Sequence, residues 1–76
     1  MPGYRTATGT ILAVQEQRFR LRTPDGRTLL LTLVRDRLVD DLARWRDART
    51  PVEVIFEGQP NLVSGVACSV RPLPGA

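Results

Sequence analysis

Arginine occupies alternate positions of one short segment, and this is the clearest pattern of chemically active side chains in the chain. Arg18, Arg20 and Arg22 are followed by Arg27, and within these ten residues only Asp25 is acidic. A guanidinium group is a planar fork of N–H donors that matches phosphate oxygens, and several together attract a phosphate backbone. The spacing therefore predicts a phosphate-binding face that contains these four arginines.

A second interpretation of the same arginines needs no ligand. A strand with one face in the core places polar side chains on its other face, because side chains alternate across a strand. All eleven basic residues of this chain are Arg, so the choice of Arg at any one position says less about binding. A solvated strand face and a binding face both remain open.

A turn at residues 23–26, Thr-Pro-Asp-Gly, places the arginines on a β-hairpin. Pro24 presets φ near the value that a type I turn requires, and Gly26 accepts the positive φ that follows in a three-residue hairpin loop. In this hairpin, Thr23 pairs with Arg27. A two-residue loop would instead pair Phe19 with a threonine, so the hydrophobic pattern favours the longer loop.

The register of this hairpin separates an apolar face from a basic face. Leu21 lies opposite Leu29, and Phe19 lies opposite Leu31, so all four side chains point toward the core. The arginines at 18, 20 and 22 point the other way. Their cross-strand neighbours on that face are Thr32, Leu30 and Thr28, and the two threonines are predicted to assist binding through their hydroxyl groups.

The rest of the chain predicts three further strands and one helix. Residues 8–14 are rich in strand-forming side chains, with Gly9 at a bend or at the start of the strand. Apolar residues at helical spacing predict a helix over residues 35–48. Strands follow at 51–57 and 62–71, the second with Val66, Cys68 and Val70 on the core face.

The order of three strands, one helix and two strands resembles the OB-fold, a five-stranded, partly open barrel. The fold class is therefore all-β with one helix, and the resemblance covers about residues 6–71. A helix between the third and fourth strands fits this barrel better than Sm-like or SH3-like barrels. OB-folds commonly bind oligonucleotides or oligosaccharides on the face of strands two and three, so the resemblance implies that the arginine face is the binding face.

Aromatic side chains are few for a protein of this kind. OB-folds that hold single strands usually stack bases on exposed rings. The alternation of the strands points Phe19 and Phe56 toward the core, and Trp45 lies on the apolar helix face. Tyr4 is therefore the candidate stacking residue. Binding of single-stranded nucleic acid would therefore depend mainly on charge and weaken with salt.

A protein-interaction module is the alternative function. The alternation of the strands points three apolar side chains away from the core, those of Leu30, Val34 and Ile55. If these side chains cluster, they could form a patch for self-association or for a protein partner. The net charge of +3 would favour an acidic protein as that partner. Under this hypothesis the chain is an accessory subunit or a homo-oligomer.

Enzymatic and metal-dependent functions are disfavoured. The chain has no His, which removes Ser-His and Cys-His nucleophile pairs and the commonest metal ligand. Its single Cys cannot form an internal disulfide or build a zinc site alone. We therefore expect no catalytic residues, no metal and no cofactor.

The 76 residues are expected to form one domain. Neither end has the apolar segment of a targeting signal, and the longest apolar runs are too short to cross a bilayer. The chain is accordingly expected to be a cytoplasmic protein with loose ends outside the barrel.

Overall fold

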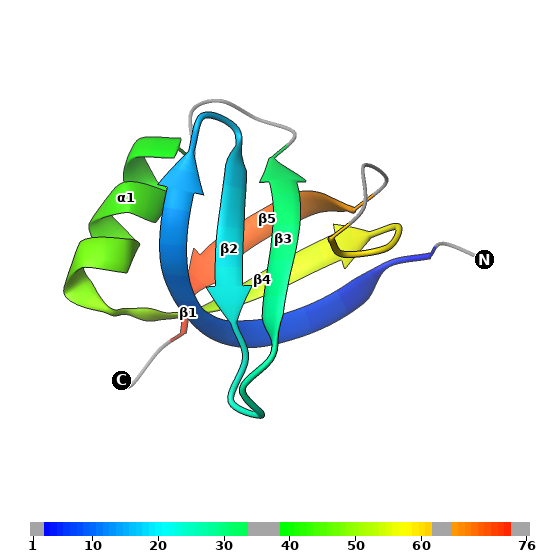
Figure 1. Ribbon diagram of the computed structural model, residues 1–76, viewed down its shortest axis with the longest axis horizontal. Coiled ribbons are helices and arrows are strands. Elements are labelled where there is room, and N and C mark those ends of the chain that lie inside the picture. Colours follow the sequence, from blue (N-terminus) through cyan, green and yellow to red (C-terminus); the bar gives the residue numbers. More distant parts are fainter. Residues whose placement is uncertain (1–2, 34–38, 62–64, 74–76) are drawn as a thin grey trace.

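Alternating apolar and polar residues build five strands in the computed structural model, which describes residues 3–33, 39–61 and 65–73. The elements are β1 (Arg5–Gln15), β2 (Arg18–Arg22), β3 (Thr28–Leu33), α1 (Val39–Ala48), β4 (Pro51–Glu57) and β5 (Val66–Pro72). The strands form a closed barrel in the order β1-β2-β3-β5-β4, with β4 paired to β1 (Figure 1). The predicted fold class is confirmed, and the barrel is consistent with an OB-like architecture.

The β2–β3 hairpin has the predicted register. Phe19 pairs with Leu31 and Leu21 pairs with Leu29. The Thr23 N–H donates to the carbonyl of Arg27 at 2.9 Å, and Gly26 has a φ of 89°. Local turn chemistry therefore sets which face of the hairpin carries the arginines.

Strand β1 is longer than the predicted residues 8–14 and pairs with two neighbouring strands. Its first half pairs with β4, and its second half pairs with β2. The change of partner occurs at Gly9 and Thr10, where a Cβ on Gly9 would lie only 2.0 Å from the carbonyl oxygen of Arg22. Gly9 therefore permits a close approach of two backbones, and because it lies inside β1 it does not mark the start of the strand.

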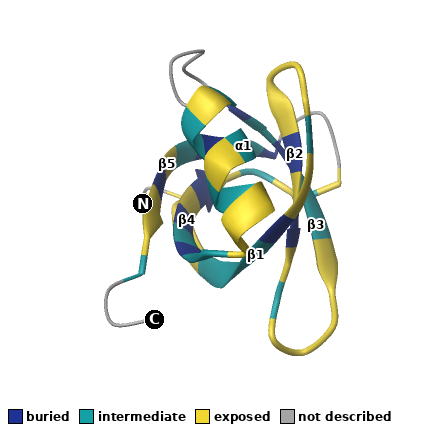
Figure 2. Cartoon of the chain, turned by 90° about the vertical axis from the view of Figure 1, so that its left-hand side faces the viewer, coloured by how far each residue is buried: buried dark blue, intermediate teal, exposed yellow. Residues whose placement is uncertain are grey.

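The core fills the barrel between the strands and the helix. α1 covers one end of the barrel, on the left of Figure 1 and facing the viewer in Figure 2. Leu42 of α1 is fully buried, and Val39 and Trp45 pack beside it. The other buried apolar residues are Ile11, Phe19, Leu21, Leu31, Leu33, Val52, Val54, Phe56, Ala67 and Val70.

Strand β5 departs from the prediction. It begins at Val66, and residues 62–64 lie outside the described residues. Ile55 pairs with Ser69 whereas Phe56 pairs with Ala67, so Cys68 is the extra residue of a β-bulge. Ala67 and Val70 are buried, and Cys68 is only half-buried. The prediction of Val70 on the core face is confirmed, but that of Val66 and Cys68 is wrong, because the bulge shifts the alternation by one residue.

Candidate functional site

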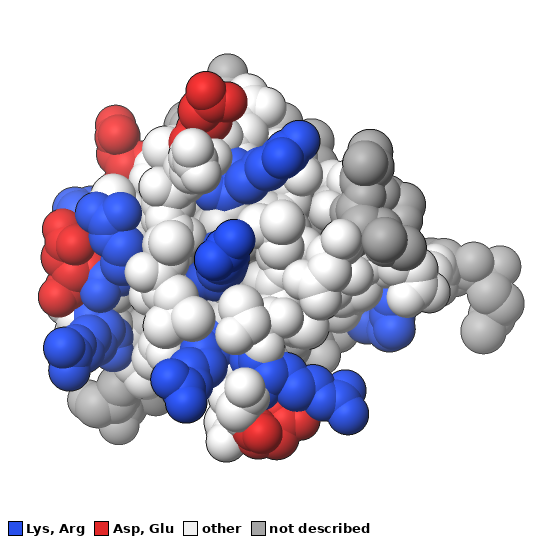
Figure 3. Space-filling model, in the orientation of Figure 1, with Lys and Arg blue, Asp and Glu red and all other residues white. Residues whose placement is uncertain are grey.

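The candidate site is centred on Arg18, Arg20 and Arg22, which we call the arginine stripe. All three side chains are exposed and alternate with the buried Phe19 and Leu21. Residues two apart on a strand are separated by about 6.7 Å, so the stripe is a regular row of positive groups along β2. Figure 3 shows basic side chains over the middle of this face with uncharged atoms between them.

Ion pairing distinguishes the stripe from most of the other arginines that the structure describes. Four described arginines pair with carboxylates: Arg27 with Asp25, Arg44 with Asp41, Arg46 with Asp47 and Arg71 with Glu53. Arg5 instead donates to the carbonyl of Gly58 at 2.6 Å and lies over the ring of Phe56. Within residues 3–33, 39–61 and 65–73, the stripe, Arg5 and Arg49 have no ion pair. The charge of the stripe is therefore not neutralised by neighbouring described residues.

The neighbours of the stripe on β3 are those predicted from the hairpin. Thr32 lies opposite Arg18, Leu30 opposite Arg20 and Thr28 opposite Arg22. Thr28 is exposed, and the other two side chains are half-buried. The structure therefore brings both predicted threonines beside the stripe.

A shallow hollow of about 280 Å³ lies in this face. Three of its lining residues come from β2: Arg18, Phe19 and Arg20. β1 contributes Ala13 and Gln15, and β3 contributes Leu30. Ala13 and Gln15 are additional site residues that the sequence did not indicate. A register shift in β1 between Ile11 and Ala13 is the reason, because it turns Ala13 outward although it has the same parity as the buried Ile11.

Arg27 lies at the hairpin tip, where its charge is partly offset. Its guanidinium Nε is 3.3 Å from the Asp25 carboxylate. A hydrogen bond from the Thr23 hydroxyl, and then one from the Arg27 N–H, lower the pKa of Asp25 below its usual 3.8. Asp25 is therefore ionised at neutral pH, and Arg27 contributes less net charge than the stripe.

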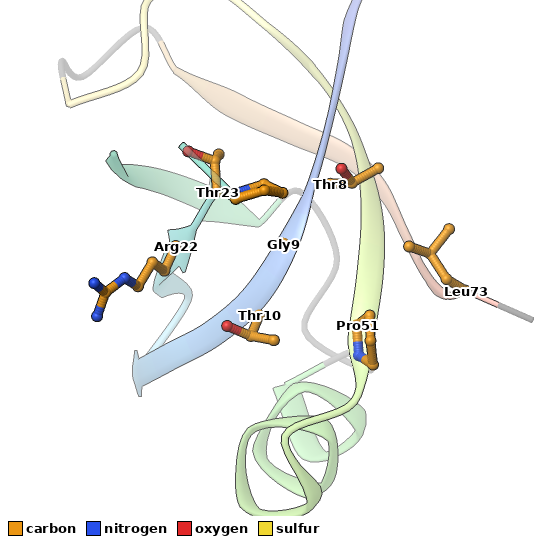
Figure 4. Close-up of a pocket in the computed structure, with 8 residues that line it drawn as sticks. Thr8, Gly9, Thr10, Arg22, Thr23, Pro51 and Leu73 are labelled. Atoms are coloured by element: carbon orange, nitrogen blue, oxygen red, sulfur yellow. The ribbon is translucent and has the colours of Figure 1, made fainter. Parts of the chain in front are cut away.

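A second pocket of about 370 Å³ adjoins the stripe where β1 crosses the end of β2. Figure 4 shows Thr8, Thr10 and Thr23 around Gly9, with the side chain of Arg22 pointing away from the bend. Pro51 and Leu73 form its apolar side. The pocket therefore shares Arg22 with the stripe, but its lining combines threonines with apolar residues and adds no further charge.

The loop between β4 and β5 holds the β3 side of the site. Asn61 donates its backbone N–H to the carbonyl of Leu30 at 2.9 Å, and its side-chain oxygen accepts from the Leu30 N–H at 2.7 Å. Asn61 has a φ of 71°, a left-handed value that Asn tolerates better than most residues. The sequence marks this position only as a turn residue after Pro60, so its pairing with β3 was not predicted.

Of the remaining predicted residues, Leu30 lies beside the stripe, whereas Tyr4 and Ile55 lie away from it. Tyr4 is 54% exposed, but it precedes the half of β1 that pairs with β4, away from the half that lines the hollow. Leu30 and Ile55 lie on β3 and β4, which are separated by β5 in the barrel. Val34 lies outside the described residues. The structure does not bring Tyr4 to the stripe or place Leu30 and Ile55 on neighbouring strands.

Other chemically active groups give little indication of a site. Burial, and secondarily Glu57, raises the pKa of the Cys68 thiol, so this thiol is less ionised than an exposed one. Among the residues that the structure describes, no group of His, Cys, Asp and Glu is arranged to hold a metal ion. No helix in that part of the chain has the length and apolar character needed to cross a membrane.

Comparisons with known proteins add no family. No protein-family model matches the chain, and a search of curated proteins found no match either.

Proposed function

We propose that this chain is a non-enzymatic binding module that holds single-stranded nucleic acid by charge on the face formed by β1, β2 and β3. The observation that supports the proposal is the arginine stripe, three outward arginines in a regular row with no ion pair among the described residues. A phosphate backbone is the common ligand with regularly spaced negative charge. OB-like barrels often use the same face, which favours an oligonucleotide over other polyanions.

Salt dependence gives the size of the expected effect. Three phosphate contacts on a single strand give a slope of about −2 in a plot of log affinity against log salt. Affinity should therefore weaken roughly 20-fold between about 50 and 200 mM salt. Fluorescence anisotropy of a labelled single strand measures this directly.

A charge-matched pair of variants tests the location of the site. Replacing Arg18, Arg20 and Arg22 together by Gln should abolish the salt-dependent binding. The control replaces Arg44, Arg46 and Arg49 by Gln, which removes the same charge from α1 and the residue after it, and it should bind like the wild type. Equal losses in both variants would show that only the net charge matters.

The acidic-protein partner is the second outcome of this experiment. If no oligonucleotide binds even at low salt, the nucleic-acid proposal fails and the stripe is then a solvated strand face, which makes an acidic protein the next partner to test. The oligomeric state, measured by sedimentation, then tests self-association separately.

A further inference from the structure

We infer that the hollow between Arg18 and Arg20 is a subsite for one unstacked nucleobase of a single strand. The inference rests on the proposed function, because it concerns the same face. It adds a specific contact to a site that would otherwise attract phosphates by charge alone.

The size and lining of the hollow favour a base over a phosphate. Its volume of about 280 Å³ lies just below the range of about 300–1,000 Å³ for small-molecule pockets. Such a space suits one planar ring system. Ala13 and Leu30 supply apolar surface, which a phosphate does not need, and the Gln15 amide supplies a donor and an acceptor for the edge of a base.

Two guanidinium groups can take the place of the missing aromatic rings. Unstacked bases in protein complexes stack on arginine planes as well as on aromatic side chains. Phe19 and Phe56 are buried, so they offer no ring surface. Arg18 and Arg20 have no ion pair within the described residues that would hold their planes in another orientation, so either is free to cover a base.

The β3 side of the hollow is held in place before a ligand binds. Leu30 is paired with Arg20 on one side, and on the other its backbone N–H and carbonyl both bond to Asn61. Because the backbone of this contact residue is held on both sides, it loses less conformational entropy when a ligand binds. The β3 wall of the hollow is therefore already formed in the folded protein before a ligand binds.

The experiment separates stacking from charge. The probes are an oligothymidylate of about twelve nucleotides, within the range of OB-fold site sizes, and an abasic strand with the same number of phosphates. In the variant R18K/R20K the charge is kept but the guanidinium planes are lost. In the variant A13L, made at an exposed position, the hollow is filled and every charge is kept. R44K/R46K is the matched control on α1.

The inference predicts that the wild type binds oligothymidylate at least about fivefold more tightly than the abasic strand, the lower end of the effect of one stacked base. R18K/R20K and A13L should each bind the two strands with about equal affinity, whereas R44K/R46K should keep the preference of the wild type. Equal affinity of the wild type for both strands overturns the inference and leaves the proposed function intact. Absence of binding to either strand at low salt overturns both.

Discussion

The close approach at Gly9 supports a quantitative prediction about the variant Gly9→Ala. The added Cβ would lie 2.0 Å from the carbonyl oxygen of Arg22, 2.8 Å from its carbonyl carbon and 3.2 Å from the Cα of Thr23. All three neighbours are backbone atoms, so no side-chain rotation can relieve the contact. Since the φ of Gly9 is not left-handed, the steric contact is the only source of the expected loss of stability. We expect a loss at or above the upper end of the overpacking range, about 3 kcal/mol.

Thermal unfolding followed by circular dichroism measures this loss. In a domain of this size, about 1 kcal/mol shifts Tm by about 4–8 °C, so Gly9→Ala should lower Tm by about 12–24 °C. Gly3→Ala is the control, because a Cβ at Gly3 meets no atom within 4 Å. The expected Tm of that control is within about 2 °C of the wild type, since surface changes cost little. A Gly9→Ala variant as stable as this control would refute the close packing of β1 against β2.

Two further predictions concern the loops beside the site. Asn61→Gly keeps the φ of 71° accessible but removes the oxygen that accepts from the Leu30 N–H, so urea unfolding should show a loss of about 1 kcal/mol. Asn61→Asp keeps an acceptor and should lose less; equal losses would contradict the role of this bond. The pKa of Asp25 is lowered in the folded state, first by the hydrogen bond from the Thr23 hydroxyl and then by that from the Arg27 N–H. The ionised Asp25 therefore stabilises the folded state at pH values above its pKa in the unfolded chain, and this stabilisation is lost as the pH falls through its pKa in the folded protein. Asp25→Asn should therefore show a smaller fall in Tm between about pH 5 and pH 2 than the wild type, and parallel curves would rule out this contribution.

Parts of the candidate site followed from local sequence, and others did not. The stripe, Thr28 and Thr32 were placed correctly because the turn and the alternation of the hairpin set their face. Ala13 and Gln15 were not predicted, because their outward direction depends on the register shift after Ile11. One extra residue in a strand moves every later side chain to the other face.

Local sequence was enough to specify the turn at residues 23–26, the register of β2 with β3, the alternation in β4 and the helical spacing of α1. These features depend on backbone preferences and on side chains only a few residues apart. The positions of Ala13 and Cys68 outside the core, the two partners of β1 and the pairing of Asn61 with Leu30 became evident from the folded barrel alone. Each depends on the register in which one segment pairs with another in the folded barrel, and the pattern of residues within a single segment does not specify that register.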